Sequence, residues 1–337
     1  MTLQEKIYTF SELSKDLRQL SNEDLQQLVW QAQANNYWFS PENVELALNT
    51  IIHYLNPESL TKWLSGYNLS AVKSGKVGVV MAGNVPAEGF HDCMCVLLSG
   101  HTLLAKVSSS DDVILKKLFR LLVEINPEFE ERIILADRLN DIDALIAKVS
   151  DKSVGQFNRY FSHIPSLIRS SRKSCAILNG NETAAELRLL GNDILHYFGL
   201  GNRNVAKLYV PEGYSFNRFF ESIEPWHHIA QHHRYVNNYD YNKSILLINQ
   251  QEHQDNGFLL VHESRQLLSP VAVLYYAVYK DSDELSQKIA ANQHQLQNIV
   301  SQNGWYPESI PFGQTTKPAL GDYIGNIDTM QFLVSVN

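Results

Sequence analysis

The chain has 337 residues, 44% of them hydrophobic, and its 28 basic and 36 acidic residues give a net charge of -8. This length and hydrophobic content suffice for about two domains with buried cores. The acidic balance argues against nucleic acid or an anionic membrane as the main partner. The longest apolar runs are too short to span a membrane, and the N-terminus lacks the features of a signal peptide. Three cysteines predict no disulfide framework, so we expect a reducing, cytoplasmic location.

Residues 1 to about 70 are expected to form helices. Ser21 followed by Asn-Glu-Asp predicts one capped helix start, and Ser40 followed by Pro41 predicts another. The period changes near Lys76, where short apolar runs begin to alternate with helical patterns. The expected strands cover 77–82, 102–106 and 132–136, and the expected helices cover 88–99 and 111–125. This alternation predicts a parallel, doubly wound sheet.

A second unit of alternating elements is expected from about residue 173. Its expected helices cover 182–197, 216–223 and 281–297, and its expected extended segments cover 175–178, 205–210, 244–249, 271–278 and 330–336. The sequence thus predicts an α/β fold of two domains. We expect N-terminal helices with a Rossmann-like cofactor domain over 1–172, a smaller catalytic domain over 173–305, and a tail, 306–337, that returns to the domain interface.

One turn in the second unit is suited to presenting a side chain to a bound carbonyl group. It runs from Gly199 through Gly201 to Asn202, and the expected strand from Val205 follows directly. A thiolate at position 202 would attack an acyl thioester or an aldehyde. The amide of Asn202 cannot. If the family resemblance described next holds, the chain has the frame of an enzyme whose nucleophile is absent.

Three segments of the chain carry a family resemblance. They are the strand–Asn-x-Pro–helix–Gly–strand–Lys unit at 78–106, the helix, glycine turn and strand at 181–211, and the Pro-Phe-Gly at 311–313. In this order they resemble the aldehyde dehydrogenase superfamily, and more closely the acyl-CoA reductases related to the fatty-acid reductase of bacterial bioluminescence. The resemblance implies an aldehyde dehydrogenase-like fold and reduction of an acyl thioester to an aldehyde by NADPH or NADH. In that reaction a cysteine, expected at position 202, attacks the thioester and hydride reduces the acyl-enzyme.

The resemblance also implies roles for individual residues. Asn84 would donate to the developing oxyanion, although a turn asparagine that bonds its own backbone is the alternative. Lys106 would contact the adenosine ribose or phosphate of NADP or NAD at the end of its strand, although a solvated lysine is as good an interpretation. The remaining expected cofactor contacts are Ser108, Ser150, Gln266 and Phe312.

One cofactor motif departs from the family pattern. Where the family has Thr-Gly-Ser at the start of a helix, this chain has Lys148-Val149-Ser150, so Val149 replaces the glycine. A β-branched side chain would crowd a pyrophosphate and disfavours a positive φ. Lys148 and Lys152 could partly compensate by their charge. The family's general-base glutamate is absent near Arg169, but reductases that form an acyl-enzyme do not need it.

The other reactive side chains do not suggest a replacement nucleophile or a metal site. Cys175 lies in an apolar strand, where a buried structural cysteine is the default. Cys93 and Cys95 face different sides of a helix. His228 and His232 are four residues apart, but no carboxylate follows at zinc-protease spacing, so we expect no metal.

Two functions fit these residues. The first is an acyl-CoA reductase with altered activity that acts on acyl-CoA or acyl carrier protein. The second is a non-catalytic homologue that binds an acyl thioester or a partner enzyme, and a homo-oligomer is compatible with either. Asn202 and Val149 favour the second function, because both replace residues that the family's reaction requires.

Overall fold

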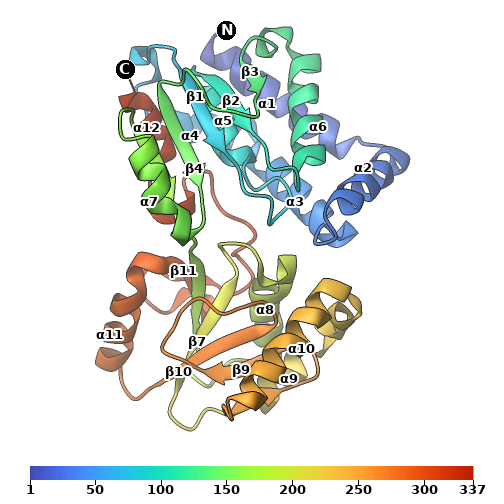
Figure 1. Ribbon diagram of the computed structural model, residues 1–337, viewed down its shortest axis with the longest axis vertical. Helices are drawn as coiled ribbons and strands as arrows, with labels where there is room; N and C mark the ends of the chain where they lie inside the picture. The colour runs from blue at the N-terminus through green and yellow to red at the C-terminus, as the bar shows by residue number, and fades with distance from the viewer. Residues whose placement is uncertain (337) are drawn as a thin grey trace. The chain divides into compact units, whose positions relative to one another are not determined.

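The computed structural model describes residues 1–336, which divide into two compact units (Figure 1). Unit 1 comprises residues 1–171 and the C-terminal segment from residue 318, and unit 2 comprises residues 172–317. The tail that returns to unit 1 was expected to begin at residue 306. In the structure, residues 306–317 belong to unit 2, and the returning segment begins at residue 318. Unit 2 is therefore an insertion in the chain of unit 1.

The chain of unit 1 begins with four helices. They are α1 (Leu3–Arg18), α2 (Asn22–Asn35), α3 (Pro41–Tyr54) and α4 (Pro57–Leu64). Ser21 caps α2 by accepting a hydrogen bond from the Asp24 amide, and Ser40 caps α3, which starts at Pro41. The predicted helix starts at Ser21 and Ser40 are confirmed.

A parallel sheet of five strands forms the centre of unit 1. Its strands are β1 (Lys76–Val80), β2 (Thr102–Lys106), β3 (Ile133–Leu135), β4 (Ala144–Lys148) and β5 (Ser166–Arg169), in the order β3-β2-β1-β4-β5. The chain builds outward from β1 to β3 and then returns to the other side of β1 with β4. The direction of winding therefore reverses between β1 and β4, as in other doubly wound sheets. The predicted parallel, doubly wound sheet is confirmed.

Four further helices belong to this sheet. They are α5 (Phe90–Ser99), α6 (Asp112–Ile125), α7 (Asp151–Tyr160) and α12 (Thr329–Ser335), and short 3₁₀ turns occur at η1 (Leu69–Ala71), η2 (Pro127–Phe129) and η7 (Ile324–Asn326). Every residue of α5 is buried, whereas α7 has no buried residue. The expected extended segment at 330–336 is wrong, because Asp328 caps a helix there. Thr329, Met330 and Leu333 point into the core at helical spacing, and α12 packs against α5.

A buried ion pair attaches the C-terminal segment to unit 1. Arg169 at the end of β5 donates to both carboxylate oxygens of Asp92 on α5 at 2.8 Å, and also donates to the Thr329 hydroxyl on α12. Both charged side chains are shielded from solvent. Arg169, near which the resemblance places the family's general base, therefore has a structural role.

The sheet of unit 2 has seven strands in the order β12-β11-β6-β7-β10-β9-β8. Their bounds are β6 (Lys173–Ile177), β7 (Val205–Pro211), β8 (His253–Asp255), β9 (Leu260–Glu263), β10 (Val273–Tyr279), β11 (Leu296–Ser301) and β12 (Ile310–Pro311). All neighbouring strands are parallel except β8 and β9.

The helices of unit 2 correct two expectations. The elements are α8 (Ala184–Leu195), α9 (Asn217–Ile223), α10 (His233–Ile248) and α11 (Ser282–Asn292), with 3₁₀ turns at η3 (His196–Gly199), η4 (Glu224–Gln231), η5 (Gln293–Gln295) and η6 (Gln302–Gly304). Residues 244–249, expected to be extended, instead form the end of α10. The helix expected over 281–297 ends at Asn292, and β11 follows it.

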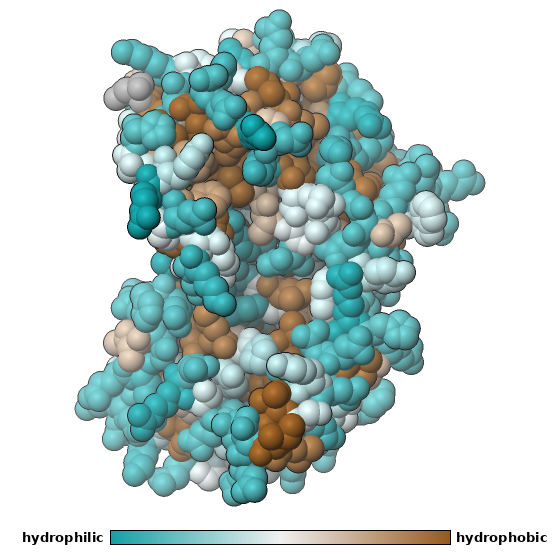
Figure 2. Space-filling model, in the orientation of Figure 1, coloured by the Kyte–Doolittle hydropathy of each residue, from teal (hydrophilic) through white to brown (hydrophobic). Residues whose placement is uncertain are grey.

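The face in Figure 2 is largely hydrophilic, with separate hydrophobic patches. Among residues 1–336, no helix combines the length and apolar character that crossing a bilayer requires.

Candidate active site

The turn that carries Asn202 begins with a sharp reversal after α8. Tyr197, Phe198 and Gly199 are three consecutive residues in the left-handed region, with φ values of 52°, 55° and 74°. Only glycine adopts this conformation without strain, and each of the other two residues costs about 1–3 kcal/mol. Surrounding contacts must therefore hold this conformation.

Two polar side chains hold the turn. Asn204 accepts a hydrogen bond from the Gly201 amide at 2.8 Å and donates to the carbonyls of Asp193 and His196 at 3.0 and 2.9 Å. The Lys173 ammonium donates to the carbonyl oxygens of Gly199 and Gly201. Neither Asn204 nor Lys173 was identified as a site residue from the sequence. The Asn-Arg-Asn run at 202–204 contained the signal, since asparagine commonly bonds to turn backbone.

Asn202 itself is buried but incompletely bonded. Asn202 is only 6% exposed, and its side-chain Nδ2 has no hydrogen-bond partner among residues 1–336. A buried donor without a partner is unfavourable by about 1–3 kcal/mol. In the same turn His196 Nδ1 is also unpaired, and burial lowers the pKa of His196 to about 4, so its ring is neutral. The turn therefore offers an amide donor and a neutral imidazole, and no nucleophile.

The Pro-Phe-Gly segment is tied to the same helix that leads to this turn. Asp193 on α8 accepts hydrogen bonds from the Gly313 amide at 2.6 Å and from the Thr315 amide and hydroxyl at 3.1 and 2.7 Å. Burial raises the pKa of Asp193 to about 6, and these hydrogen bonds oppose the increase. The Asp193 carbonyl accepts from Asn204 in the turn of Asn202, and the Asp193 carboxylate accepts from Gly313, next to the buried Phe312. Asp193 thus connects the two segments.

A buried lysine fixes the segment that carries Gln266. Lys207 on β7 is 1% exposed, and its ammonium donates to the carbonyls of Ser264 and Gln266 at 2.5 and 3.0 Å. Burial lowers the pKa of Lys207 to about 8. Gln266 is exposed, so its side chain is accessible to a ligand.

None of the three cysteines has the exposure or the lowered pKa that a nucleophile needs. Burial raises the pKa of Cys175 to about 12, and the pKa values of Cys93 and Cys95 are raised well above their usual range by burial and the nearby Asp92 charge. All three thiols are fully buried, so each stays protonated and inaccessible at neutral pH.

In unit 1, Asn84 lies in the loop that follows β1. Its side chain is exposed and makes no hydrogen bond with residues 1–336, so the alternative of an asparagine bonded to its own backbone is not observed. Asn36, buried after α2, donates to the Gly83 carbonyl at 3.0 Å and holds this loop. A Cβ at Gly83 would lie 2.7 Å from Ser108 Oγ, so glycine permits the close approach of the loops after β1 and β2.

The residues at the start of α7 differ from the expected phosphate motif in two ways. Val149 does not have a positive φ, and its amide donates to the Arg169 carbonyl, so the β-branched side chain is not strained there. Lys148 forms an ion pair with Glu88 at 2.5 Å, so the carboxylate balances its positive charge. This pairing argues against the expectation that Lys148 attracts a pyrophosphate in place of the missing glycine. Ser150 is the N-cap residue of α7, and its hydroxyl bonds to the Ser153 hydroxyl at 2.8 Å.

The histidine cluster does not form the helical pair considered from the sequence. His228 lies in η4, and its Nδ1 contacts the Pro225 carbonyl at 2.9 Å. His232 follows the end of η4 and caps α10 by accepting from the Tyr235 amide. Within the described part of the chain, no three His, Cys, Asp or Glu residues are arranged to hold a metal ion.

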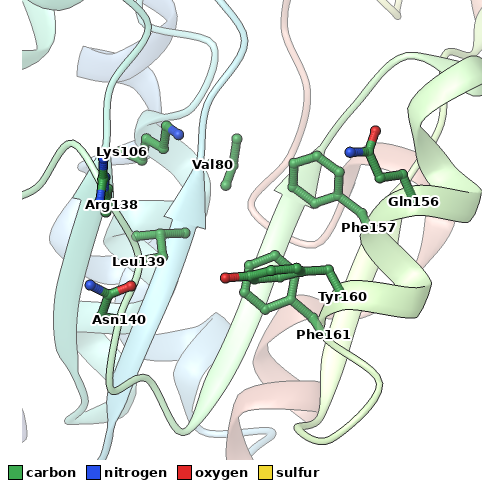
Figure 3. A pocket seen from close by; sticks show the side chains of 9 residues that line it. All are labelled: Val80, Lys106, Arg138, Leu139, Asn140, Gln156, Phe157, Tyr160 and Phe161. Atoms are coloured by element: carbon green, nitrogen blue, oxygen red, sulfur yellow. The ribbon is translucent and has the colours of Figure 1, made fainter.

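A cavity of about 290 Å³ opens at the carboxyl ends of β1 and β2 in unit 1, and Figure 3 shows its lining. Val80 and Lys106 line it from the ends of these strands, and Phe157 and Tyr160 line it from α7. Lys106 is thus the expected cofactor residue that the structure places in a cavity. Ser108 instead accepts a hydrogen bond from the Ser110 amide within its own loop.

Several solved structures share the fold of this chain. Proline utilization A from Bradyrhizobium japonicum has 13% identity and a TM-score of 0.65, with 89% of this chain and 36% of that chain covered. Aldehyde dehydrogenase C from Pseudomonas syringae, in complex with NAD+ and octanal, has 12% identity and a TM-score of 0.63, with 89% of this chain and 72% of that chain covered. The indole-3-acetaldehyde dehydrogenase AldA from P. syringae, in complex with NAD+ and IAA, has 11% identity and a TM-score of 0.66, with 95% of this chain and 75% of that chain covered. The chain spans about a third of the length of the proline utilization A protein and about three quarters of the two dehydrogenases. The fold is that of the aldehyde dehydrogenase superfamily.

The sequence narrows this class. Residues 5–154 match the family of acyl-CoA reductases (LuxC). This match and the fold confirm the resemblance to acyl-CoA reductases of the aldehyde dehydrogenase superfamily. No curated protein sequence matches the chain.

Proposed function

We propose that the chain is an acyl-CoA reductase-like protein that binds an acyl thioester and a nicotinamide dinucleotide but is impaired in the covalent step of the family reaction. The observation that carries the proposal is Asn202, held in the nucleophile turn by Asn204 and Lys173. The turn is held by these hydrogen bonds and Asn202 is buried, but its amide side chain cannot attack a carbonyl carbon. Acyl-CoA or acyl carrier protein would be the partner, and the cytoplasm the location.

The remaining residues of the proposed site can bind and orient a substrate. The unpaired Asn202 Nδ2 would donate to a carbonyl oxygen. In a catalytic relative, the thiolate would form a bond to the acyl carbon and release the thiol of CoA. Without a thiolate the C–S bond of the thioester stays intact, so the proposed reaction is slow or absent.

The dinucleotide, when bound, would supply hydride. The chemistry of the residues in unit 1 fits its adenosine part, because the cavity at β1 and β2 combines aromatic walls with a cation at Lys106. Ser150 at the start of α7 would face the pyrophosphate. Val149 limits the space near the pyrophosphate, so we expect weak rather than tight binding of NADP or NAD.

A second function is a non-catalytic protein that holds an acyl group without turnover. The unpaired Nδ2 of Asn202 favours it, because this buried donor would gain a partner from a carbonyl or carboxylate oxygen. Replacing Asn202 by Ala is then expected to weaken binding of a non-hydrolysable acyl-CoA analogue by about tenfold. Unchanged binding in isothermal titration would exclude this role for the amide.

The test of the proposed function is NAD(P)H oxidation with acyl-CoAs of several chain lengths. We expect no turnover by the natural chain and measurable turnover by Asn202→Cys. Asn181→Cys is the matched control, because it adds a thiol at an exposed asparagine of the same unit. Turnover by the natural chain, or equal turnover by both variants, would contradict the proposal.

A further inference from the structure

The cavity in unit 1 lies where an open α/β sheet binds ligands. It opens beyond the carboxyl ends of β1 and β2, and α7, which follows β4, forms its other wall (Figure 3). The reversal of winding between β1 and β4 creates this crevice, which is the general ligand position in doubly wound sheets. Its volume of about 290 Å³ is near the lower end of small-molecule sites, roughly 300–1,000 Å³, and suits one part of a larger ligand.

The α7 side of the cavity is an uncovered aromatic surface. Phe157, Tyr160 and Phe161 lie on this side in Figure 3, and no residue of α7 is buried. Phe157 and Phe161 are one helical turn apart, with ring centres 5.9 Å apart. An amphipathic helix normally buries its apolar face. This face is instead open to the cavity, where it can stack against a planar heterocycle such as adenine.

The opposite side of the cavity carries positive charge. Lys106 at the end of β2 and Arg138 in the loop after β3 both line it, and the lining contains no Asp or Glu. Within residues 1–336 neither cation has an ion-pair or hydrogen-bond partner. A site for an unmodified adenosine ribose usually has a carboxylate that accepts from the 2′-hydroxyl, whereas an arginine accommodates a phosphate there. The charge of this lining matches the second case.

From these contacts we infer that Arg138, together with Lys106, binds a phosphate group on the ribose of an adenine nucleotide. Arg138 would be the residue that determines specificity, because its planar guanidinium can pair with two phosphate oxygens, while Lys106 acts as a point charge. The inference rests on the proposed function only in that the nucleotide belongs to the same reaction. The phosphate has two chemical sources there: the 2′-phosphate of NADP(H) and the 3′-phosphate of CoA.

The experiment measures equilibrium binding to the full-length chain rather than turnover. NADPH, NADH, 2′,5′-ADP, 3′,5′-ADP and 5′-AMP are each titrated in isothermal calorimetry. We expect at least tenfold tighter binding of a ribose-phosphorylated nucleotide than of its unphosphorylated counterpart. Preference for NADPH and 2′,5′-ADP assigns the phosphate to NADP(H), and preference for 3′,5′-ADP assigns it to CoA.

Two variants assign the effect to Arg138. Arg138→Ala is expected to remove most of the preference and to leave 5′-AMP binding unchanged. Arg159→Ala is the matched control, because Arg159 is an exposed arginine on α7 that does not line the cavity. Arg138 is exposed, so its replacement is not expected to change the thermal midpoint.

Each outcome of the titrations decides one of the two proposals. Equal affinity for NADPH and NADH, and equal affinity for 3′,5′-ADP and 5′-AMP, would overturn the inference about Arg138 but leave dinucleotide binding intact. A preference that survives in Arg138→Ala would also overturn it. The absence of binding by all five nucleotides would contradict both the inference and the nucleotide part of the proposed function.

Discussion

At position 202 a single side chain changes what the site can do. The turn around it is held by Asn204 and Lys173, and its backbone accepts a left-handed conformation at Tyr197 and Phe198. Such strain persists only where the surroundings fix it, and it is common at functional sites. The strained turn around Asn202 is therefore held by its surroundings, which supports the binding role that we propose for it.

His196 and Asp193, which flank this turn, predict opposing pH effects on stability. Burial lowers the pKa of His196 to about 4, so the unfolded chain takes up its proton first, and stability is lost as pH falls from about 6.5 to 4. The effect is on the order of 3 kcal/mol. Burial raises the pKa of Asp193 to about 6, so the folded chain takes up that proton first and stability is gained as pH falls from about 6 to 4.

These two effects partly cancel in the natural chain and separate in a variant. The free energy of unfolding of His196→Phe, compared with that of the natural chain at the same pH, is expected to be higher at pH 5 than at pH 7. His196→Gln tests whether this difference depends on the aromatic ring. Urea unfolding at both pH values measures the difference. The same pH dependence in the natural chain and in both variants would contradict a buried neutral His196.

At the scale of elements, the sequence predicted those whose signals are local. Ser21, Ser40 and Pro41 start helices where expected, since capping depends on residues within one turn. The errors occur where tertiary contacts decide. Residues 330–336 were expected to be extended, but burial of Met330 and Leu333 against α5 makes them helical. The apolar run at 244–249 ends α10 with Leu247 and Ile248 exposed, which propensity alone does not indicate.

The residues of the candidate site also divide into those with a local sequence signal and those whose position depends on tertiary contacts. Asn202 and Lys106 could be identified from motifs in the sequence. Lys207 and Asp193 could not, because their hydrogen bonds reach segments distant in the chain. Arg138 could not, because its position in the cavity depends on how the sheet and α7 fold together.

The turn from β4 into α7 gives a prediction about the cofactor. Val149 is unstrained but is expected to crowd a pyrophosphate at the start of α7. Val149→Gly is therefore expected to bind NADPH severalfold more tightly, with a loss of about 1 kcal/mol in stability from added backbone freedom. Val149→Ala separates crowding from flexibility. Calorimetry measures the affinity, and weaker binding by both variants would contradict the crowding argument.

At the scale of the whole molecule, the chain leaves unit 1 for unit 2 and returns at residue 318. The returning segment is bound by polar contacts as well as by its apolar side chains. His91 contacts the Leu320 carbonyl and His101 contacts the Leu333 carbonyl, each at 3.0 Å, and Arg169 joins Thr329 to Asp92. Unit 1 is thus completed only by the last part of the chain.

Weakening this segment should destabilise one unit and spare the other. Leu333→Ala leaves a cavity against α5 and is expected to reduce the stability of unit 1 by about 2–5 kcal/mol. Hydrogen exchange should then increase in α5 and β5 but stay unchanged in β6 and β7. Leu189→Ala, at an exposed leucine of unit 2, is the control. Equal increases in both units would contradict their independence.

We expect Asn202 to prevent the covalent step of the family reaction. Intact-mass spectrometry after incubation with excess acyl-CoA tests it directly. We expect no acyl adduct on the natural chain and one acyl group on Asn202→Cys, released as hydroxamate by hydroxylamine, as a thioester would be. An acyl adduct on the natural chain, or none on Asn202→Cys while it remains folded, would show that Asn202 does not block this step.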